Sequence, residues 1–429
     1  MKENNMSSMK IIDADSHEFL EELTISTVNA CRVEAGNGSK NALPFTAIFP
    51  GGRGCYPAIW IQDFTMIFAS GLVSEQEGLE HLRLILRCQN GESARHLKSN
   101  AVIPPYAIPD HINIDGSPVF YPGTYSSGEN QGGEPWGFVP PTNNHYDVIW
   151  LTEMLTHKLK ASELLKEDVA GMSVYERLKR AFDVPTADPE TGMVTTTPEH
   201  RAVGFIFCDS IYMTGDLLMA SLLRYRAATH LAVFADKLGK EQDKQEYLRI
   251  ARLIQANIVH IFADIPRYGG WLKASTGFSG QPDVWGTIYS VYIGALQGDD
   301  RKRVMQTIVN AIEIGQIESE GGLRHVPLNY DASESAVWEK TPTAKNRYQN
   351  GAYWHMPAGW LISALQMDYP DTAKAVFDRY IKHMRENSFT KGSGYGAPWE
   401  CFGWGGAANQ NAIFGPSISM LYGIIMKQC

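Results

Sequence analysis

The chain has 429 residues, a mass of 47.7 kDa, a formal net charge of −9 and a pI near 5.8. Hydrophobic residues make up 44% and charged residues 20%, which is a globular composition and excludes a disordered or coiled-coil chain. Because no block rich in Lys or Arg is present, neither a nucleic acid nor a polyanionic polysaccharide is expected as the main partner.

The six cysteines form no recognisable metal or disulfide pattern. They stand at positions 31, 55, 88, 208, 401 and 429 without a Cys-x-x-Cys pair, so no metal or cofactor is expected. The N-terminal segment lacks the apolar core of a signal peptide, and glycine and proline interrupt the late apolar stretch 411–426. As the sequence stands, we expect a cytoplasmic protein without a membrane span; removal of a signal peptide would make it periplasmic or secreted.

Apolar residues at three- and four-residue spacing predict twelve helices. In chain order they cover about 17–32, 59–73, 76–90, 145–160, 172–182, 210–238, 242–264, 285–297, 299–316, 350–367, 370–387 and 411–427. Every second one, from 59–73 onward, is apolar or small on most faces, whereas the helices between them carry most of the Lys, Arg and Glu residues. Six apolar helices enclosed by six amphipathic ones predict an all-α fold, the (α/α)6 toroid. We expect one domain over 1–429, with a long irregular insertion at about 92–143.

Aromatic residues collect in the loops that lead into the apolar helices. The tryptophans concerned are Trp60, Trp136, Trp271, Trp285, Trp354, Trp399 and Trp404. In a toroid these loops converge on one mouth, where aromatic faces stack on sugar C–H bonds while amides and carboxylates bind hydroxyl groups. Packing of the loops onto the barrel is the simpler explanation for any single tryptophan, but seven together favour a carbohydrate pocket.

Five segments, in order along the chain, resemble the six-hairpin glycosidase superfamily, which includes alkaline invertases and exo-α-mannosidases. They are IWIQDFTMIFASGLV (59–73), NNHYDVIWLTEML (143–155), FCDSIYMTGDLLMASLL (207–223), NGAYWHMPAGWL (350–361) and APWECFGWGG with the last inner helix (397–424). The resemblance implies a glycoside hydrolase whose general acid lies in the third segment and whose base lies in the fifth. Gln62 stands where many relatives have Arg, and His355 where many have Pro.

Hydrolysis with inversion needs two carboxyl groups roughly 6.5–9.5 Å apart, one protonated and one that activates water. Asp209 follows the apolar run VGFIFC, so burial should raise its pKa, as a general acid requires. Capping of the helix expected from 210 is the competing explanation for Asp209. Glu400 lies among Trp399, Phe402 and Trp404, and the indole N–H groups of the two tryptophans could keep it ionised as the base.

The remaining contacts are expected from the same loops. Asp63 is predicted to bind a sugar hydroxyl group, and the further predicted contacts are Trp60, His145, Asp147, Asn350, Trp354, His355 and Trp404. The expected partner is a neutral oligosaccharide. Two alternatives are a toroidal sugar epimerase or isomerase that uses His145, His325 and His355, and a catalytically silent carbohydrate-binding protein.

Overall fold

The computed structural model describes residues 12–36, 40–403 and 409–426. Its helices are α1 (Ala14–Cys31), α2 (Ile61–Phe68), α3 (Glu75–Arg87), α4 (Asn143–Lys158), α5 (Ala161–Lys166), α6 (Val174–Phe182), α7 (Leu218–Lys237), α8 (Glu241–Phe262), α9 (Ile265–Tyr268), α10 (Val284–Tyr292), α11 (Gly298–Glu313), α12 (Ala358–Leu365), α13 (Pro370–Asn387) and α14 (Pro416–Ile425).

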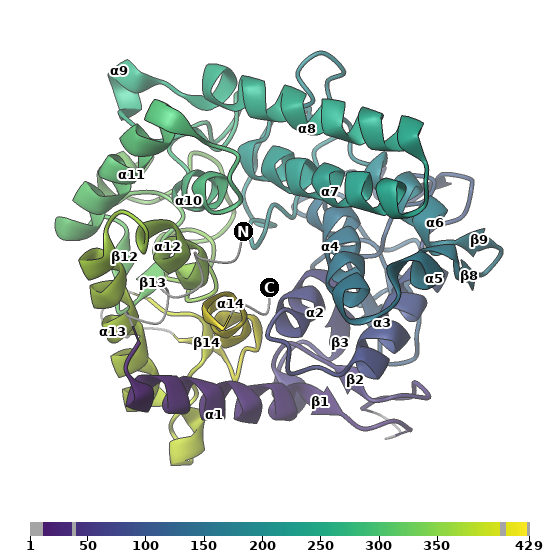
Figure 1. Cartoon of the computed structure of the whole chain (residues 1–429), viewed down its shortest axis with the longest axis horizontal. Helices are drawn as coiled ribbons and strands as arrows, with labels where there is room; N and C mark the ends of the chain where they lie inside the picture. Colours follow the sequence, from purple (N-terminus) through teal and green to yellow (C-terminus); the bar gives the residue numbers. More distant parts are fainter. Residues whose placement is uncertain (1–11, 37–39, 404–408, 427–429) are drawn as a thin grey trace.

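Six of these helices form a closed inner ring (Figure 1). Around the ring, α2 packs on α4, α4 on α7, α7 on α10, α10 on α12 and α12 on α14, and α14 returns to pack on α2. The ring forms because its helices are apolar on nearly all faces; every residue of α2, for example, is buried. Helices that are hydrophobic all round need partners on every side, and two ring neighbours together with an outer helix provide them.

The amphipathic helices pack outside this ring (Figure 1). Helix α1 packs on α14, α3 on α4, α6 on α4 and α7, α8 on α7, α11 on α10 and α13 on α12. Helix α3 shows how sequence defines such an element: Ser74 and Glu77 make a capping box at its start, and Arg87 lies in its last turn. The prediction of an all-α toroid is confirmed.

The strands are short and lie in the connections. They are β1 (Arg32–Val33), β2 (Ala47–Ile48), β3 (Ala58–Trp60), β4 (Arg95–His96), β5 (Val102–Ile103), β6 (His111–Asn113), β7 (Pro118–Val119), β8 (Asp168–Val169), β9 (Met172–Ser173), β10 (Thr195–Thr196), β11 (Gly215–Asp216), β12 (Glu318–Ser319), β13 (Gly322–Leu323), β14 (Trp399–Cys401) and β15 (Gln410–Ala412). Within the segment 92–143, β6 pairs antiparallel with both β3 and β7. This small sheet fixes the segment beside the start of α2.

Two inner helices begin eight residues later than predicted. Helix α7 starts at Leu218 instead of 210, because the preceding residues form β11, which pairs with β10. Helix α12 starts at Ala358 instead of 350, since Gly351 has a φ of +103°, outside the helical region, and Pro357 directly precedes the first turn. Asp209 therefore does not cap α7, whose N-cap is Leu217.

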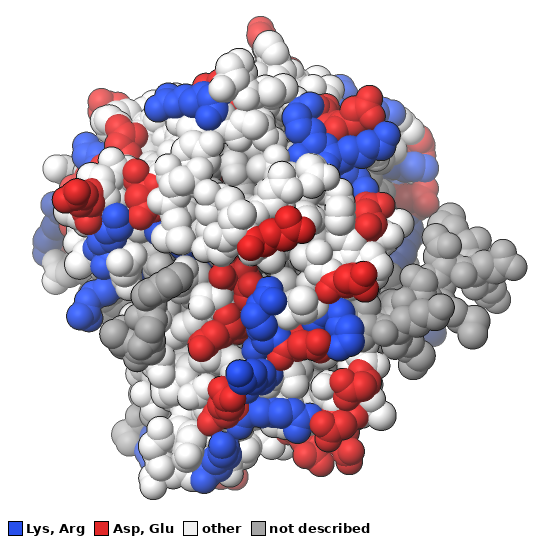
Figure 2. Space-filling view, turned by 90° about the vertical axis from the view of Figure 1, so that its left-hand side faces the viewer, with Lys and Arg blue, Asp and Glu red and all other residues white. Residues whose placement is uncertain are grey.

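On the face seen in Figure 2, blue Lys and Arg side chains lie among red Asp and Glu side chains. Ion pairs such as Lys302–Asp299 (3.1 Å) on α11 and Lys374–Asp378 (2.7 Å) on α13 illustrate this mixing. In the described part of the chain, no helix combines the length and the apolar character that crossing a bilayer requires.

Candidate active site

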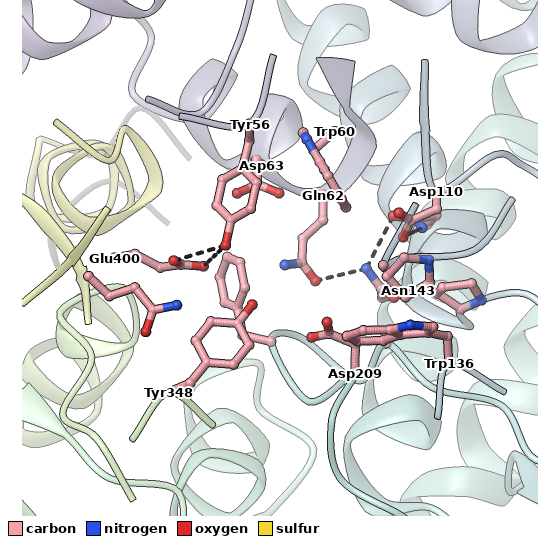
Figure 3. A pocket seen from close by; sticks show the side chains of 17 residues that line it. Tyr56, Trp60, Gln62, Asp63, Asp110, Trp136, Asn143, Asp209, Tyr348 and Glu400 are labelled. Carbon is pink, nitrogen blue, oxygen red and sulfur yellow. Dashed lines mark hydrogen bonds between the residues drawn. The ribbon is translucent and has the colours of Figure 1, made fainter. Parts of the chain in front are cut away.

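A cavity of about 240 Å³ opens where the inner helices α2 and α4 begin. Its walls come from separate parts of the chain, which Figure 3 shows from close by. The lining residues are Tyr56, Trp60, Gln62, Asp63, Asp110, Pro122, Gly123, Trp136, Pro141, Asn143, Asn144, Gly204, Phe207, Asp209, Tyr348, Glu400 and Gln410. Four of them carry carboxyl groups, and no Lys, Arg or His occurs among the described residues of this lining.

Trp60 and Asp63 are positioned by the junction of β3 and α2. Trp60 ends β3 and is the N-cap residue of α2, and Asp63 lies in the first helical turn with 6% of its surface exposed. The Trp60 ring stacks on His111 of β6, with centroids 4.1 Å apart, and Asp110 Oδ2 lies 2.8 Å from His111 Nδ1. The insertion thus backs one wall of the pocket and contributes Asp110.

Glu400 lies on β14, next to the last inner helix. In the antiparallel β14–β15 pair it stands opposite Asn411, whose side-chain amide donates a hydrogen bond to Glu400 Oε2. The Tyr56 hydroxyl lies 3.2 Å from Oε1 and 3.1 Å from Oε2 (Figure 3). The donors that hold Glu400 are therefore the Asn411 amide and the phenol groups of Tyr56 and Tyr348. The indole groups expected from the sequence do not supply them: Trp399 Nε1 has no partner among the described residues, and Trp404 lies outside those residues.

Asp209 lies on the loop before α7, beside Trp136 and on a different side of the pocket from Glu400 (Figure 3). The Gln349 side-chain amide donates a hydrogen bond to Asp209 Oδ1, and its oxygen accepts one of 2.6 Å from the Ser210 backbone N–H. Gln349 is fully buried and does not line the pocket, so these two hydrogen bonds fix Asp209 from the protein interior.

One dipeptide connects the surroundings of the two carboxyl groups. Gln349 binds Asp209, and the adjacent Tyr348 lines the pocket between Asp209 and Glu400 (Figure 3). The Tyr348 backbone has a φ of +46°, and its ring packs on Trp354 with centroids 5.3 Å apart. A non-glycine residue in this backbone region persists only where surrounding contacts hold it.

The carboxyl groups perturb one another. Burial raises the pKa of Glu400 to about 8, even though hydrogen bonds from Asn411 and Tyr56 act in the opposite direction. Burial raises the pKa of Asp209 to about 6, with the hydrogen bond from Gln349 lowering it. Burial, followed by repulsion from Glu400, raises the pKa of Asp63 well above its ordinary value. Near neutral pH the pocket therefore retains a proton on Glu400 more readily than on Asp209.

A chain of amides leads from the pocket into the ring. Gln62 Oε1 accepts a 2.8 Å bond from Asn143 Nδ2, which also lies 3.4 Å from Asp147 Oδ2. Asp147 is one turn deeper on α4, 1% exposed, and its other oxygen lies 3.4 Å from Arg226 Nη2. Asp147 thus lies outside the pocket lining, where it balances the partly buried Arg226.

The structure also places other predicted contacts outside the lining. His145 is buried between the Pro141 carbonyl and the Ile108 N–H. The Asn350 side chain accepts hydrogen bonds from the backbone N–H groups of Val337 and Trp338.

The last two predicted contacts lie deeper behind the pocket. Trp354 is fully buried and stacks on Phe207, with centroids 5.1 Å apart. His355 is fully buried, and its Nε2 lies 3.0 Å from the Glu320 carbonyl. Each of these side chains supports a neighbouring backbone segment or ring instead of facing the cavity.

The histidines of the epimerase alternative do not gather at the pocket. His145, His325 and His355 all lie outside the lining, and burial lowers the pKa of each. Burial lowers that of His145 to about 4 and that of His325 to about 3.

Several pocket residues were not predicted. Tyr56 and Tyr348, and Gln349 behind the lining, lie just before the segments 59–73 and 350–361 that carry the sequence resemblance. Asp110 had no comparable signal, because its place depends on the pairing of β6 with β3.

The sequence matched no family model and no curated protein. Solved structures do resemble the chain. A rhamnosidase from Klebsiella oxytoca with rhamnose bound superposes with a TM-score of 0.60 at 11% identity, covering 97% of this chain and 65% of that one. The chain thus spans just under two thirds of the rhamnosidase chain.

Two structures from Thermus thermophilus each superpose with a TM-score of 0.54 over 94% of this chain and 99% of theirs. One is a GH63 mannosylglycerate hydrolase in complex with glucose, at 13% identity, and the other is an uncharacterized conserved protein, at 11% identity. The chain therefore shares the helical toroid of these structures, which is the fold that the sequence resemblance implied.

Proposed function

We propose that this protein is a glycoside hydrolase that acts on neutral sugars by inversion. The observation that supports this best is the placement of two buried carboxyl groups, Asp209 and Glu400, on different sides of one aromatic-walled cavity. They precede the third and sixth helices of the inner ring, which stand opposite each other, so a sugar in the cavity would lie between them.

In the proposed reaction, Asp209 gives its proton to the glycosidic oxygen as the bond to the anomeric carbon breaks. Glu400 takes a proton from a water molecule, whose oxygen attacks the opposite face of that carbon. Three side chains support the sugar: the Trp60 face stacks on C–H bonds, while Asp63 and Asp110 accept hydrogen bonds from hydroxyl groups. The number of protons on the pair is conserved, since one carboxyl group loses a proton and the other gains one.

The proton distribution of the pocket adds a requirement. With a pKa of about 8 for Glu400 and about 6 for Asp209, the shared proton rests on Glu400 in the free enzyme. The proposed reaction requires this proton on Asp209. Binding of the glycoside must therefore favour the less populated form, in which Asp209 is protonated and Glu400 is ionised. If Glu400 were the acid and Asp209 the base, activity would cover the same pH range. A leaving group that needs no proton would then restore the rate of the Glu400 variant instead of the Asp209 variant.

The charge of the lining supports neutral substrates. No basic side chain occurs in the described lining, so the carboxylate of a uronic acid or of a glycerate group would face Asp63, Asp110 and Asp209 without compensation. The same reasoning applies to phosphate, and it favours water over phosphate as the nucleophile.

A screen of aryl glycosides tests the proposal, with each neutral glycoside paired to its uronide. We expect turnover of a neutral member, release of the inverted anomer by proton NMR, and at least ~10²-fold slower hydrolysis in Asp209→Asn and Glu400→Gln. With a 2,4-dinitrophenyl leaving group, which needs no proton, the acid variant should regain most of its rate and the base variant should not. A retained anomer, or saturable sugar binding without turnover of any glycoside, would refute the proposed function.

A further inference from the structure

A second and larger cavity, of about 660 Å³, lies at the other end of the inner ring. The active-site pocket is lined by the first residues of α2 and α4, whereas this cavity is lined by the last residue of α2 and the C-terminal half of α4. Its lining consists of Phe68, Gly71, Trp150, Glu153, Met154, His157, Lys158, Arg226, Thr229, His230, Tyr292 and Ile293. We call it the distal cavity.

The distal cavity has the opposite charge character to the active-site pocket. Arg226, Lys158, His157 and His230 contribute nitrogen groups, and Glu153 contributes the one carboxyl group of the described lining. The Glu153 carboxylate is already engaged, because its Oε1 bonds His157 Nε2. Lys158 forms no ion pair with any described carboxylate; its Nζ lies 5.5 Å from the centre of the Phe68 ring.

Arg226 is held in place by its neighbours. Its guanidinium carbon lies 4.0 Å above the Trp150 ring and 5.6 Å from the centre of the Tyr289 ring. One contact of 3.4 Å to Asp147 engages one nitrogen of a group that has five N–H donors. A further interaction joins the guanidinium to the Tyr289 side chain, and a planar anion could pair with its other donors, because the stacked rings already restrict the side chain.

Basic groups surround His230 at the distal cavity. Burial lowers the pKa of His230 to about 3, and the next causes are repulsion from Arg226 and from His157. The C-terminal dipole of α4 explains why His157 and Lys158 lie in its last turn. It does not explain Arg226, which lies in the middle of α7 and points into the ring.

We propose that the distal cavity is a second ligand site, for a small organic anion. Arg226 would pair with its carboxylate or phosphate group, Lys158 would add charge at the rim, and Trp150, Phe68 and Tyr292 would cover its body. The volume is within the range usual for small-molecule sites, whereas the active-site pocket is smaller. This site is independent of the proposed hydrolase activity.

Calorimetric titration of the full chain at low ionic strength tests the proposal. Glucose 6-phosphate and citrate represent the phosphate and carboxylate ligands, and inorganic phosphate tests the anion alone. Glucose is the uncharged control, and it is titrated into the Asp63→Ala variant, in which the proposed sugar contacts of the active-site pocket are weakened. We expect an anionic probe to bind at least ~10-fold more tightly than glucose, with affinity that falls as salt rises. Whichever of the first two binds more tightly identifies the anionic group that the cavity prefers.

Variants locate the binding. Arg226→Gln should weaken binding of the anionic probe at least ~10-fold. Lys158→Glu should weaken it by a similar factor, and this substitution leaves the contact between Arg226 and Asp147 in place. Arg249→Gln, on the exposed face of α8, should leave the affinity unchanged, and so should Asp63→Ala in the active-site pocket. If Arg226→Gln does not fold, Lys158→Glu decides. Equal affinities for glucose and both anionic probes, or anion binding that Lys158→Glu leaves intact, would overturn the proposal.

Discussion

Replacing Glu400 by Gln should stabilise the protein, and increasingly so as the pH rises. The wild-type side chain is 1% exposed and shares its cavity with three other carboxyl groups. Its ionised form is therefore disfavoured in the folded state, which is why the pKa rises to about 8. Glutamine has the shape of the protonated acid but never becomes charged.

The sign and size of the effect follow from proton linkage. Between the ordinary pKa of 4.5 and about 8, the folded protein binds a proton that the unfolded chain has lost, so wild-type stability falls as the pH rises through this window. At about 1.4 kcal/mol per pH unit, the whole window corresponds to about 5 kcal/mol. Asp63 and Asp209 take part in the same repulsion, so removing the charge of Glu400 recovers only part of this free energy. We expect Glu400→Gln to stabilise the folded protein by about 2–4 kcal/mol.

Thermal unfolding at pH 4.5, 6, 7 and 8 measures the effect without a substrate. The melting temperature of Glu400→Gln minus that of the wild type should increase steadily over this series, reaching several degrees at pH 8. Taking differences between pH values removes any constant cost of the amide. The exposed Glu92→Gln provides the matched control, with a flat difference. A flat difference for Glu400→Gln as well would show that Glu400 ionises normally and would refute the reasoning about this pocket.

Three further predictions concern activity once a substrate is found. The kcat/KM profile should be bell-shaped with limbs near pH 6 and 8, because activity needs one proton on the Asp209–Glu400 pair; a profile rising through pH 9 would contradict this. Gln349→Ala should lower kcat about 10-fold and shift the acid limb upward, since the amide lowers the pKa of Asp209; steady-state rates across pH measure both. Gly123→Ala should raise KM several-fold with little change in kcat, because an added Cβ would lie 2.1 Å from the Trp136 ring; an unchanged KM would mean that this ring does not touch the sugar.

The sequence predicted the inner and outer helices well because the evidence for them is local. The alternation of all-round apolar and amphipathic segments can be read from any single helix pair, and it predicted the six pairs of the ring. The start of α7 depends instead on a partner: β11 forms only because β10, twenty residues earlier, pairs with it. A helical apolar pattern before Leu218 could not reveal that competing contact.

Only part of the pocket could be predicted, because the rotation of a buried inner helix also depends on contacts that the sequence does not reveal. Trp60 and Asp63 were expected to contact the sugar, and the structure brings both to the cavity beside Asp209 and Glu400. On α4 the expected contact Asp147 is one turn too deep, while the neighbouring Asn143 lines the cavity. In a helix buried on every side, the sequence carries no polar face from which its rotation could be read.

Closure of the ring completes the site. Asp63 comes from the first inner helix and Glu400 from β14, and their carboxyl groups repel each other when both are ionised. That repulsion opposes folding, so it must be offset where these segments meet, which is the packing of α14 against α2. Weakening this packing, for instance with Ile418→Ala on the fully buried face of α14, should therefore open the carboxyl pair before the rest of the toroid unfolds. Hydrogen exchange at neutral pH would detect this as low protection factors in α2 and α14, and at pH 4.5 these protection factors, corrected for the slower intrinsic exchange, should rise. Uniform exchange throughout the ring would show instead that the two ends of the chain are no weaker than any other junction.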